Sequence, residues 1–433
     1  MFWRGLFGYL PVQAVDALIG VGAVVAFTRL LTPEQFGHYA LAFSAAALVQ
    51  SLFLVWTEAA MERFHVQSVE AGEARDHLST IHRAYVALAT LGGLTAAGIL
   101  AVVSLNPDLE LALAAGAAAV IVNSGLKLIQ HRRRAEGRVG VYAVTDLLCL
   151  IGGFAGGLGL AVAGLGGAAP AIGVAVAALL GLLLSLPGEL ARARGGRFQP
   201  ERARRYAAYG LPLAFSLMLG TLLASMDRFL IAGFLDEAQV GIYHAGYGLA
   251  HRTLDIMFIW LGLAGAPALI AALERRGLGA MQDAARLQGE VMVLVALPAA
   301  VGIALVAQPT ADLLLGAALR DGAAQVMPWI AASAFFAGMT THYLRQAFTL
   351  GQRPGLLFVV IGITAAANLV LNLVLIPRFG LDGAVWATTG SFVLGAVGSW
   401  ALGRRVMPLP LPIEALARCG LAAAAMAAAL SFL

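Results

Sequence analysis

Residues 355–402 read GLLFVVIGITAAANLVLNLVLIPRFGLDGAVWATTGSFVLGAVGSWAL, two long apolar runs joined by a short segment that contains Pro377, Arg378 and Asp382. Each run is close to the ~20 residues that a helix needs to cross the ~30 Å hydrocarbon layer of a bilayer. The apolar residues are continuous rather than alternating, which favours helices over barrel strands, the two structures that satisfy their backbone in lipid. The stretch therefore predicts two membrane-spanning helices, 355–376 and 381–402.

The rest of the chain repeats this pattern. Of its 433 residues, 60% are hydrophobic and only 12% are charged, whereas about a quarter of residues are charged in soluble domains. The sequence predicts an all-α integral membrane protein with twelve core helices, at 6–31, 36–56, 83–104, 109–127, 141–163, 166–187, 206–235, 240–265, 289–307, 326–348, 355–376 and 381–402. A further apolar stretch, 414–433, predicts a thirteenth helix at the C-terminal end.

The distribution of cations between alternate loops predicts the orientation. If the N-terminus is cytoplasmic, 23 of the 28 lysines and arginines lie on cytoplasmic segments, only Arg320 and Arg378 lie outside, and three lie within helices. Cytoplasmic loops of membrane proteins carry this excess, so we expect a cytoplasmic N-terminus in a cell membrane and no cleavable signal peptide. The same rule explains the net charge of +4 without a nucleic-acid partner.

Four pairs of similar segments recur in the same order in the two halves. Gly8-Tyr9-Leu10-Pro11 resembles Tyr209-Gly210-Leu211-Pro212, and residues 31–39 resemble 235–243. Residues 135–140 likewise resemble 350–355, and 164–168 resemble 380–384. An even number of helices per repeat predicts two six-helix lobes in parallel repeat, related by an axis along the membrane normal. The predicted parts are an N-terminal lobe at 1–188, a basic cytoplasmic linker at 189–205, a C-terminal lobe at 206–403, and a linker with the extra helix at 404–433.

Two similar lobes around a central cleft are typical of alternating-access transport. The single lysine, Lys127, lacks the glycines and the Ser or Thr of a phosphate-binding loop, and the metal-protease, thiol and nucleophile-elbow patterns are absent from the sequence. We therefore expect a transporter and not an enzyme, with no cofactor and no metal, driven by an ion gradient, the membrane potential or consumption of substrate on the far side.

Three stretches resemble a known family. Residues 28–39 (TRLLTPEQFGHY) look like the start of the polysaccharide-biosynthesis flippases of the multidrug/oligosaccharidyl-lipid/polysaccharide (MOP) exporter superfamily. Residues 368–384 (NLVLNLVLIPRFGLDGA) are a more specific match, and 227–231 with 241–243 are similar to that family's second-lobe opening. The resemblance covers residues from about 6 to 403. Many similar members have fourteen helices, whereas thirteen are predicted here.

The resemblance implies two bundles in a V-shaped, MATE-like transporter that moves a lipid-linked oligosaccharide, commonly on undecaprenyl diphosphate, to the outer leaflet. A cation-coupled multidrug antiporter of the same superfamily is the first alternative, and the embedded arginines argue against it. A membrane glycan polymerase or ligase is the second, and the longest outer segment, 308–325, is short and mostly apolar for such an enzyme. The expected partners are the lipid-linked oligosaccharide, membrane lipids and H⁺ or Na⁺, with no nucleic acid.

Ionisable residues inside predicted spans are the candidate site residues. On the eighth helix, His251, Arg252 and Asp255 lie close to the midplane, and Arg252 and Asp255, at i and i+3, can pair on one face. They form either a headgroup or proton-coupling site or a structural ion pair. Asp227 and Arg228 on the seventh helix point about 100° apart, so Arg228 faces either the cavity or a partner within the lobe. Asp227, like Asp255, is a candidate for ion coupling or for structural pairing.

Other candidates are more ambiguous. Asp16 and Asp146 are lone carboxylates, suited to cation or proton coupling or to pairing with an arginine. Arg29 is near the outer end of its helix, where snorkelling to the interface is the default, and it is also a headgroup candidate. His342 and Arg345 lie in the inner half of the tenth helix, where they could attract a headgroup from the cytoplasm.

Three groups of residues have mainly structural interpretations. Asn368 and Asn372 share a helix face and are expected to form interhelical hydrogen bonds, with substrate contact as the alternative. Glu58, Glu62 and Arg63 are expected at a solvated helix end, with lining of the cleft entrance as the alternative. The run from Lys127 to Arg138 could bind anionic lipid phosphates, although topology alone explains it equally well.

Overall fold

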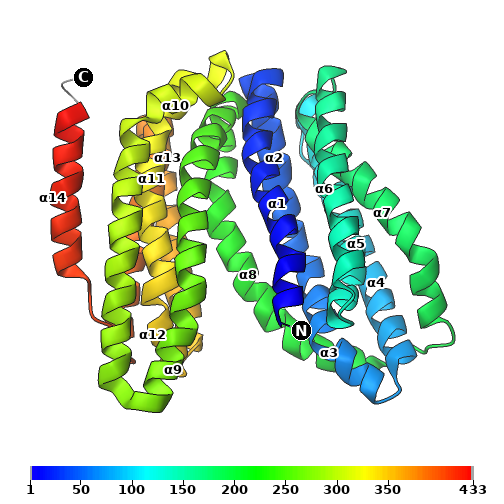
Figure 1. Ribbon diagram of the computed structural model, residues 1–433. Helices are drawn as coiled ribbons and strands as arrows, with labels where there is room; N and C mark the ends of the chain where they lie inside the picture. Colours follow the sequence, from blue (N-terminus) through cyan, green and yellow to red (C-terminus); the bar gives the residue numbers. More distant parts are fainter. Residues whose placement is uncertain (1, 431–433) are drawn as a thin grey trace. The chain divides into compact units, whose positions relative to one another are not determined.

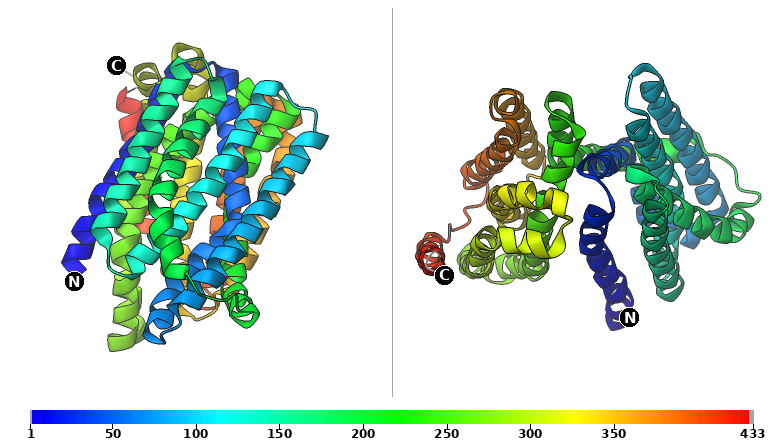
Figure 2. Two further views of the ribbon diagram at one scale, coloured as in Figure 1. Left: turned by 90° about the vertical axis from the view of Figure 1, so that its right-hand side faces the viewer. Right: turned by 90° about the horizontal axis from the view of Figure 1, so that it is seen from above.

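The computed structural model describes residues 2–430, with side chains from residue 11 onward except those of Ala264 and Leu430. Over these residues every regular element is a helix, and the chain forms two compact units, residues 1–225 and 226–433 (Figure 1). The helices of each unit run roughly side by side (Figure 2). The side chain of Arg4 and residues 431–433, the end of the predicted thirteenth helix, lie outside the described residues.

The first unit contains six helices that correspond to the first six predicted spans, followed by the start of a seventh. The π-helical turn at Gln50–Leu54 joins α2 and α3 into one continuous helix. The elements are α1 (Phe2–Leu30), α2 (Pro33–Val49), α3 (Val55–Glu70), α4 (Ala74–Val102), α5 (Pro107–Ala135), α6 (Val139–Val162), α7 (Ala169–Ala193) and the first part of α8 (Pro200–Phe234).

The second unit contains the remaining predicted spans. Both α9 and α13 fold back on themselves, at Gly277 (φ 83°) and Gly380 (φ 59°), because glycine adopts this left-handed region without a Cβ penalty. Each is therefore two helices, as the predicted pairs of spans require. The elements are the end of α8, α9 (Glu237–Leu305), α10 (Ala307–Leu314), α11 (Arg320–Met339), a π-helical turn (Thr340–Leu344), α12 (Gln346–Leu350), α13 (Gly355–Gly403) and α14 (Ile413–Leu430).

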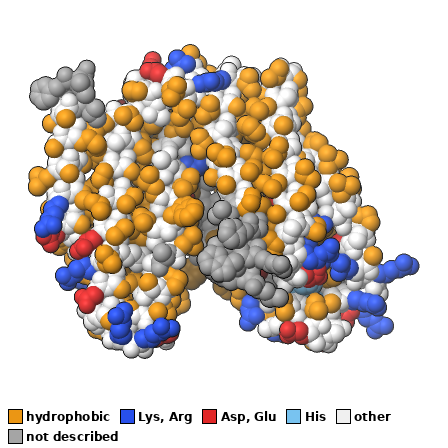
Figure 3. Space-filling view, in the orientation of Figure 1, with side chains coloured by type: hydrophobic (Ala, Val, Ile, Leu, Met, Phe, Trp, Pro, Cys, Tyr) orange, Lys and Arg blue, Asp and Glu red, His pale blue; other side chains and the backbone are white. Residues whose placement is uncertain are grey.

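The helices have the length and the surface of membrane spans. Nine helices of the described chain are long and apolar enough to cross a bilayer, with α9 and α13 each counted once. Within each unit, hydrophobic side chains cover the middle of the helices and charged side chains gather near their ends (Figure 3). The chain is a multi-pass membrane protein.

Several helices extend beyond the predicted spans at their charged ends. The predicted 36–56 continues to Glu70, 83–104 begins at Ala74, and 109–127 continues to Ala135. Charged residues mark where the hydrocarbon layer ends, but Arg, Glu and Gln are good helix formers and do not end the helix. The prediction that Glu58 lies at a solvated helix end is wrong, because Glu58 lies within α3 and is only 8% exposed.

Corresponding helices in the two units begin with the same kind of cap. The Thr32 side chain accepts a hydrogen bond from the Gln35 backbone N–H at 3.2 Å, and the Gln35 side chain accepts one from the Thr32 backbone N–H at 3.2 Å. Asp236 accepts a hydrogen bond from the Gln239 backbone N–H at 2.8 Å. These caps satisfy backbone donors that a helix N-terminus leaves unpaired. The similarity of residues 31–39 to 235–243 is therefore also a similarity of local structure.

Small residues allow α6 and α7 to pack backbone against backbone. A Cβ added to Gly173 would overlap the backbone of Gly153 and Gly157, and one added to Gly157 would lie 3.1 Å from the Pro170 Cα. Contacts between small residues are common between membrane helices because they maximise van der Waals packing where lipid removes the hydrophobic driving force. This contact holds α7 in place, and α7 carries the buried Glu189 described below.

Candidate functional site

One face of α9 carries aromatic and ionisable side chains at successive turns. Tyr243, Tyr247, His251 and Asp255 are spaced by four residues, which places them in a row. The rings of Tyr247 and His251 stack, with centroids 4.7 Å apart and an interplanar angle of 12°. Asp255 is close enough to act electrostatically on His251. The row extends from the capped start of α9 to the middle of its first half.

Arg228 of α8 is bound to this part of α9. It is 6% exposed, and its Nε donates to His244 Nδ1 at 3.1 Å. Its guanidinium lies over the Tyr247 ring, 4.9 Å from the centroid. A desolvated cation over an aromatic face gains up to about 2 kcal/mol. His244 must accept at Nδ1, so its imidazole is neutral in this arrangement.

Arg252 does not form the ion pair that its spacing to Asp255 allows. Arg252 is exposed and Asp255 is half-buried, and no ion pair joins them among the residues that the structure describes. The structural ion pair that the spacing allows is therefore absent between these two residues. Arg252 lies about 22 Å from Glu237 at the 1.5 Å rise per residue of a helix, which places an exposed guanidinium far from the helix end.

Two further sequence candidates lie at the π-helical turn after α11: His342 is within the turn, and Arg345 follows it directly. The His342 ring stacks with Phe258, with centroids 6.2 Å apart and an interplanar angle of 12°. A Cβ at Gly262 would lie 2.6 Å from His342 Nδ1, so only glycine allows this approach. Arg345 is half-buried, and its Nε is buried with no hydrogen-bond partner within the described part of the chain. Such turns are frequent at functional sites.

Asp227 is the centre of a buried polar network. Its carboxylate, 2% exposed, accepts hydrogen bonds from Tyr243 Oη (2.8 Å), Thr388 Oγ1 (2.8 Å) and Asn372 Nδ2 (2.7 Å). Asn368 donates to Ser391 at 3.3 Å, so both asparagines form interhelical hydrogen bonds. The Asn372 Oδ1 is buried with no partner among the described residues. Buried polar atoms are nearly always paired, so this free oxygen requires an explanation.

The sequence candidates of the first unit are more dispersed. Asp16 and Arg29 are exposed on α1, and Arg29 lies next to the end of this helix. Asp146 of α6 is half-buried and accepts a hydrogen bond from Tyr142 Oη at 3.4 Å. Asp16 acts on Asp146 electrostatically, so the two lone carboxylates lie near each other on neighbouring helices.

An ion-pair network at the charged end of the first unit was missed by sequence reasoning. Arg132 Nε donates to both Glu189 oxygens at 3.0 and 2.8 Å, and the Arg132 and Glu189 side chains are 3% and 2% exposed. Arg132 also pairs with Glu136 at 2.6 Å, and Glu136 with His65 at 3.2 Å. The only sequence signal was the i, i+4 spacing of Arg132 and Glu136, because residues 128–138 were assigned to a loop.

Glu136, in the turn between α5 and α6, shows how strong this network is. Its partial burial alone would raise the pKa of the carboxyl group. The hydrogen bond and the charge of Arg132, with the hydrogen bond to His65, outweigh this effect and lower the pKa of Glu136 below its ordinary value. Glu136 therefore stays ionised at neutral pH.

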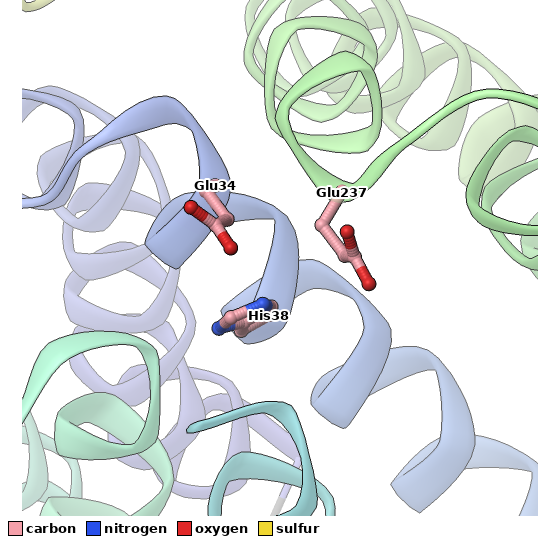
Figure 4. A group of neighbouring side chains, drawn as sticks. All are labelled: Glu34, His38 and Glu237. Carbon is pink, nitrogen blue, oxygen red and sulfur yellow. The ribbon is translucent and has the colours of Figure 1, made fainter. Parts of the chain in front are cut away.

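Figure 4 labels three further polar residues near helix starts. Glu34 is exposed in the first turn of α2, His38 is buried one turn later, and Glu237 begins α9. Acidic residues in a first turn interact favourably with the positive end of the helix dipole. This effect explains the two glutamates without a ligand.

Comparison with known proteins agrees with this architecture. A sequence model of the family described as "Polysaccharide biosynthesis protein" matches residues 26–322. No curated protein matches the chain. Among solved structures, the lipid II flippase MurJ in an inward closed conformation superposes with a TM-score of 0.74 at 13% identity, over 97% of this chain and 91% of that chain. An inward-facing multidrug resistance MATE family transporter of the MOP superfamily gives 0.67 at 12% identity, over 90% and 94%. The chain has the fold of these two solved structures.

Proposed function

This chain belongs to the polysaccharide biosynthesis protein family, and we propose that it is a flippase that moves a lipid-linked oligosaccharide from the cytoplasmic to the outer leaflet by alternating access. The carrier is undecaprenyl diphosphate. The protein resides in the cell membrane with a cytoplasmic N-terminus, and residues 1–188 and 206–403 act as two lobes around the substrate. The fold shared with a lipid II flippase supports this proposal.

The observation that carries the proposal is the exposed Arg252 far from either end of a membrane-length helix. A charged side chain facing acyl chains at this depth costs at least about 2.5 kcal/mol, so this face of α9 borders water or substrate. A sugar needs such a path, because each uncompensated polar group moved into hydrocarbon costs roughly 2–7 kcal/mol. Arginine suits a diphosphate because its planar fork pairs two phosphate oxygens.

The structure suggests different roles for the candidate cations. Arg252 and Arg345, with His342 and His251, are the proposed headgroup ligands, because Arg252 is exposed and Arg345 retains a buried N–H without an acceptor. Arg228 is proposed to orient His244 and Tyr247 on α9 through the contacts described above. Arg29, exposed at the end of α1, is proposed to meet the headgroup at the outer interface.

The test uses the purified protein in liposomes that contain a fluorescent undecaprenyl-diphosphate-linked sugar, followed by its exposure to an external sugar-modifying reagent. Loss of a charge-assisted pair worth about 1.5–3 kcal/mol predicts that Arg252→Ala slows translocation about 10- to 100-fold. Arg228→Ala is expected to slow translocation as well, because His244 and Tyr247 on α9 would lose the side chain that orients them. Arg353→Ala, an exposed arginine between α12 and α13, is the matched control and should retain the wild-type rate.

The opposing outcome is equally specific. A wild-type protein that moves no lipid-linked sugar but exchanges a cationic dye for protons or Na⁺ would replace the flippase by a multidrug antiporter. In that case the carboxylates of Asp16, Asp146 and Asp255 become the residues to substitute.

Asp227 is proposed as the coupling-ion site. Around its carboxylate lie the hydroxyl oxygens of Tyr243 and Thr388 and the amide of Asn372. The Nδ2 of this amide donates to Asp227, and its Oδ1 has no partner among the described residues. Hard cations bind such sets of carboxylate, hydroxyl and amide oxygens. Rotation of the Asn372 amide would turn its Oδ1 toward the carboxylate and complete a Na⁺ site, which accounts for the free oxygen.

We expect Na⁺, but not K⁺, to stabilise the wild-type protein against thermal unfolding in detergent, by about 2.7 kcal/mol at a hundredfold excess over the dissociation constant. Asp227→Asn should abolish this shift. The exposed carboxylate variant Asp283→Asn should retain it. A Na⁺-dependent shift that persists in Asp227→Asn would place the ion elsewhere, and a shift in response to pH alone would favour proton coupling.

A further inference from the structure

Some of the cations in the basic run from Lys127 to Arg134 form ion pairs, and others do not. Arg132 forms ion pairs with Glu189 and Glu136. The Arg134 guanidinium lies over Tyr142, 5.4 Å from the centroid, and is 3.9 Å from Glu62. His131 lies 3.2 Å from Glu62. The carboxylates of Glu189, Glu136 and Glu62 therefore already interact with Arg132, Arg134 or His131.

Arg133 is held differently from its neighbours. Its Nη1 donates to Gln130 Oε1 at 2.9 Å and to Thr145 Oγ1 at 3.2 Å, and its Nη2 donates to Ser185 Oγ at 2.9 Å. These three acceptors are neutral and come from α5, α6 and α7. Arg133 forms no ion pair within the described part of the chain. A full positive charge is thus fixed in position by three helices without a counter-ion.

The arrangement leaves capacity for an anion. A guanidinium has five N–H donors, and the three bonds above leave two of them for another acceptor. Its Nε takes part in none of these three bonds and is not among the buried unpaired atoms, so this donor is reachable from outside. Arg132, Arg138 and Arg192 act on Arg133 as like charges, and Glu189 acts on it as an opposite charge. Glu189 is itself paired with Arg132, so the exposed Arg138 and Arg192 leave an excess of positive charge beside Arg133.

The surface beside Arg133 is apolar. On α6, Val141, Val144 and Leu148 are 42%, 59% and 67% exposed, and on α7, Leu183 and Leu184 are 53% and 85% exposed. Lys and Arg side chains gather at this end of the first unit, next to hydrophobic side chains (Figure 3). A fixed guanidinium beside exposed aliphatic side chains matches a molecule with a phosphate head and acyl tails.

We propose that Arg133, oriented by Gln130, Thr145 and Ser185, binds the phosphate of an anionic membrane phospholipid whose acyl chains lie along α6 and α7. The lipid supplies the missing negative charge and fastens the α5–α6–α7 end of the unit to the membrane surface. This site uses none of the proposed headgroup ligands on α9 and at the turn between α11 and α12, and it does not depend on what the protein transports.

The test is binding of fluorescent cardiolipin to the full-length protein in detergent, with phosphatidylcholine as the zwitterionic comparison. Loss of a charge-assisted phosphate contact predicts that Arg133→Ala weakens cardiolipin binding about tenfold or more. Arg133→Lys should recover only part of it, because an ammonium keeps the charge but loses the fork. Arg83→Ala, an exposed arginine on α4 in the same unit, is the matched control and should change the affinity less than twofold.

Two results would overturn the proposal. One is cardiolipin affinity that is equal in wild type and Arg133→Ala. The other is full competition by millimolar inorganic phosphate, which would make the site one for free anions rather than lipid. If Arg133→Ala fails to fold, the pair Thr145→Val and Ser185→Ala removes two of the three acceptors that orient the guanidinium and must weaken cardiolipin binding, or the inference is wrong.

Discussion

Arg132→Met is expected to lower the free energy of unfolding by about 3–5 kcal/mol. Among the described residues, the substitution leaves the Glu189 carboxylate, 2% exposed, with only the His82 ring, 3.4 Å away, as an ion-pair partner. An unpaired buried charge is far more costly than the absence of the pair. Titration with sodium dodecyl sulfate in mixed micelles, followed by circular dichroism, measures the change.

The double variant Arg132→Met with Glu189→Leu separates this explanation from simple loss of packing. Replacing both partners by apolar residues is often neutral or stabilising, so the double variant should recover most of the loss. Arg192→Ala is the surface control. Its side chain is 46% exposed and lies 3.8 Å from Glu136, and exposed pairs contribute at most about 1 kcal/mol. A double variant as unstable as Arg132→Met would contradict the electrostatic account.

Gly173→Leu is expected to destabilise the first unit by about 1–3 kcal/mol or more. The added side chain would overlap the backbone of Gly153 and Gly157 on α6, which cannot move aside as a flexible side chain can. Separation of α6 from α7 would also displace Ser185 and Glu189 from their partners on α5. The fraction of monodisperse protein that survives heating, measured by size-exclusion chromatography, reports the effect.

The matched control is Gly188→Ala, because the same helix α7 has open space around that position. Alanine is favoured over glycine in a helix by up to about 1 kcal/mol, so this variant should be as stable as wild type or slightly more stable. Equal heat resistance of Gly173→Leu and wild type would show that the two helices separate without cost.

Helix positions could be predicted well from sequence, because hydrocarbon imposes one requirement on every span. The apolar length of the runs 355–376 and 381–402 and the Pro-Arg-Phe-Gly interruption between them were enough to predict these two helices. The predicted helix ends were less accurate where charge was taken as a boundary. Residues 128–134 are helical because the chain emerges from the apolar layer without a helix breaker before Gly137.

For the candidate residues, too, the sequence predicted some properties and not others. Asp227 and Arg228 were identified by their charge within a span, but the sequence could not show that Asp227 accepts bonds from α9 and from both halves of α13. The spacing of Arg252 and Asp255 permits an ion pair, and the structure shows none between these two described residues. Spacing fixes only which side chains share a helix face. Packing between helices determines which partner each of these side chains contacts.

The sequence by itself determined that this protein is a bundle of membrane helices and which family it resembles, because apolar length and short motifs are local properties. Only the tertiary structure decided which cations are paired. Arg132, Arg133 and Arg134 are adjacent in sequence, yet the first is buried against Glu189, the second is held by neutral oxygens and the third lies over Tyr142. Successive helical residues point about 100° apart, so each meets a different neighbouring helix, and those neighbours are brought together only by folding.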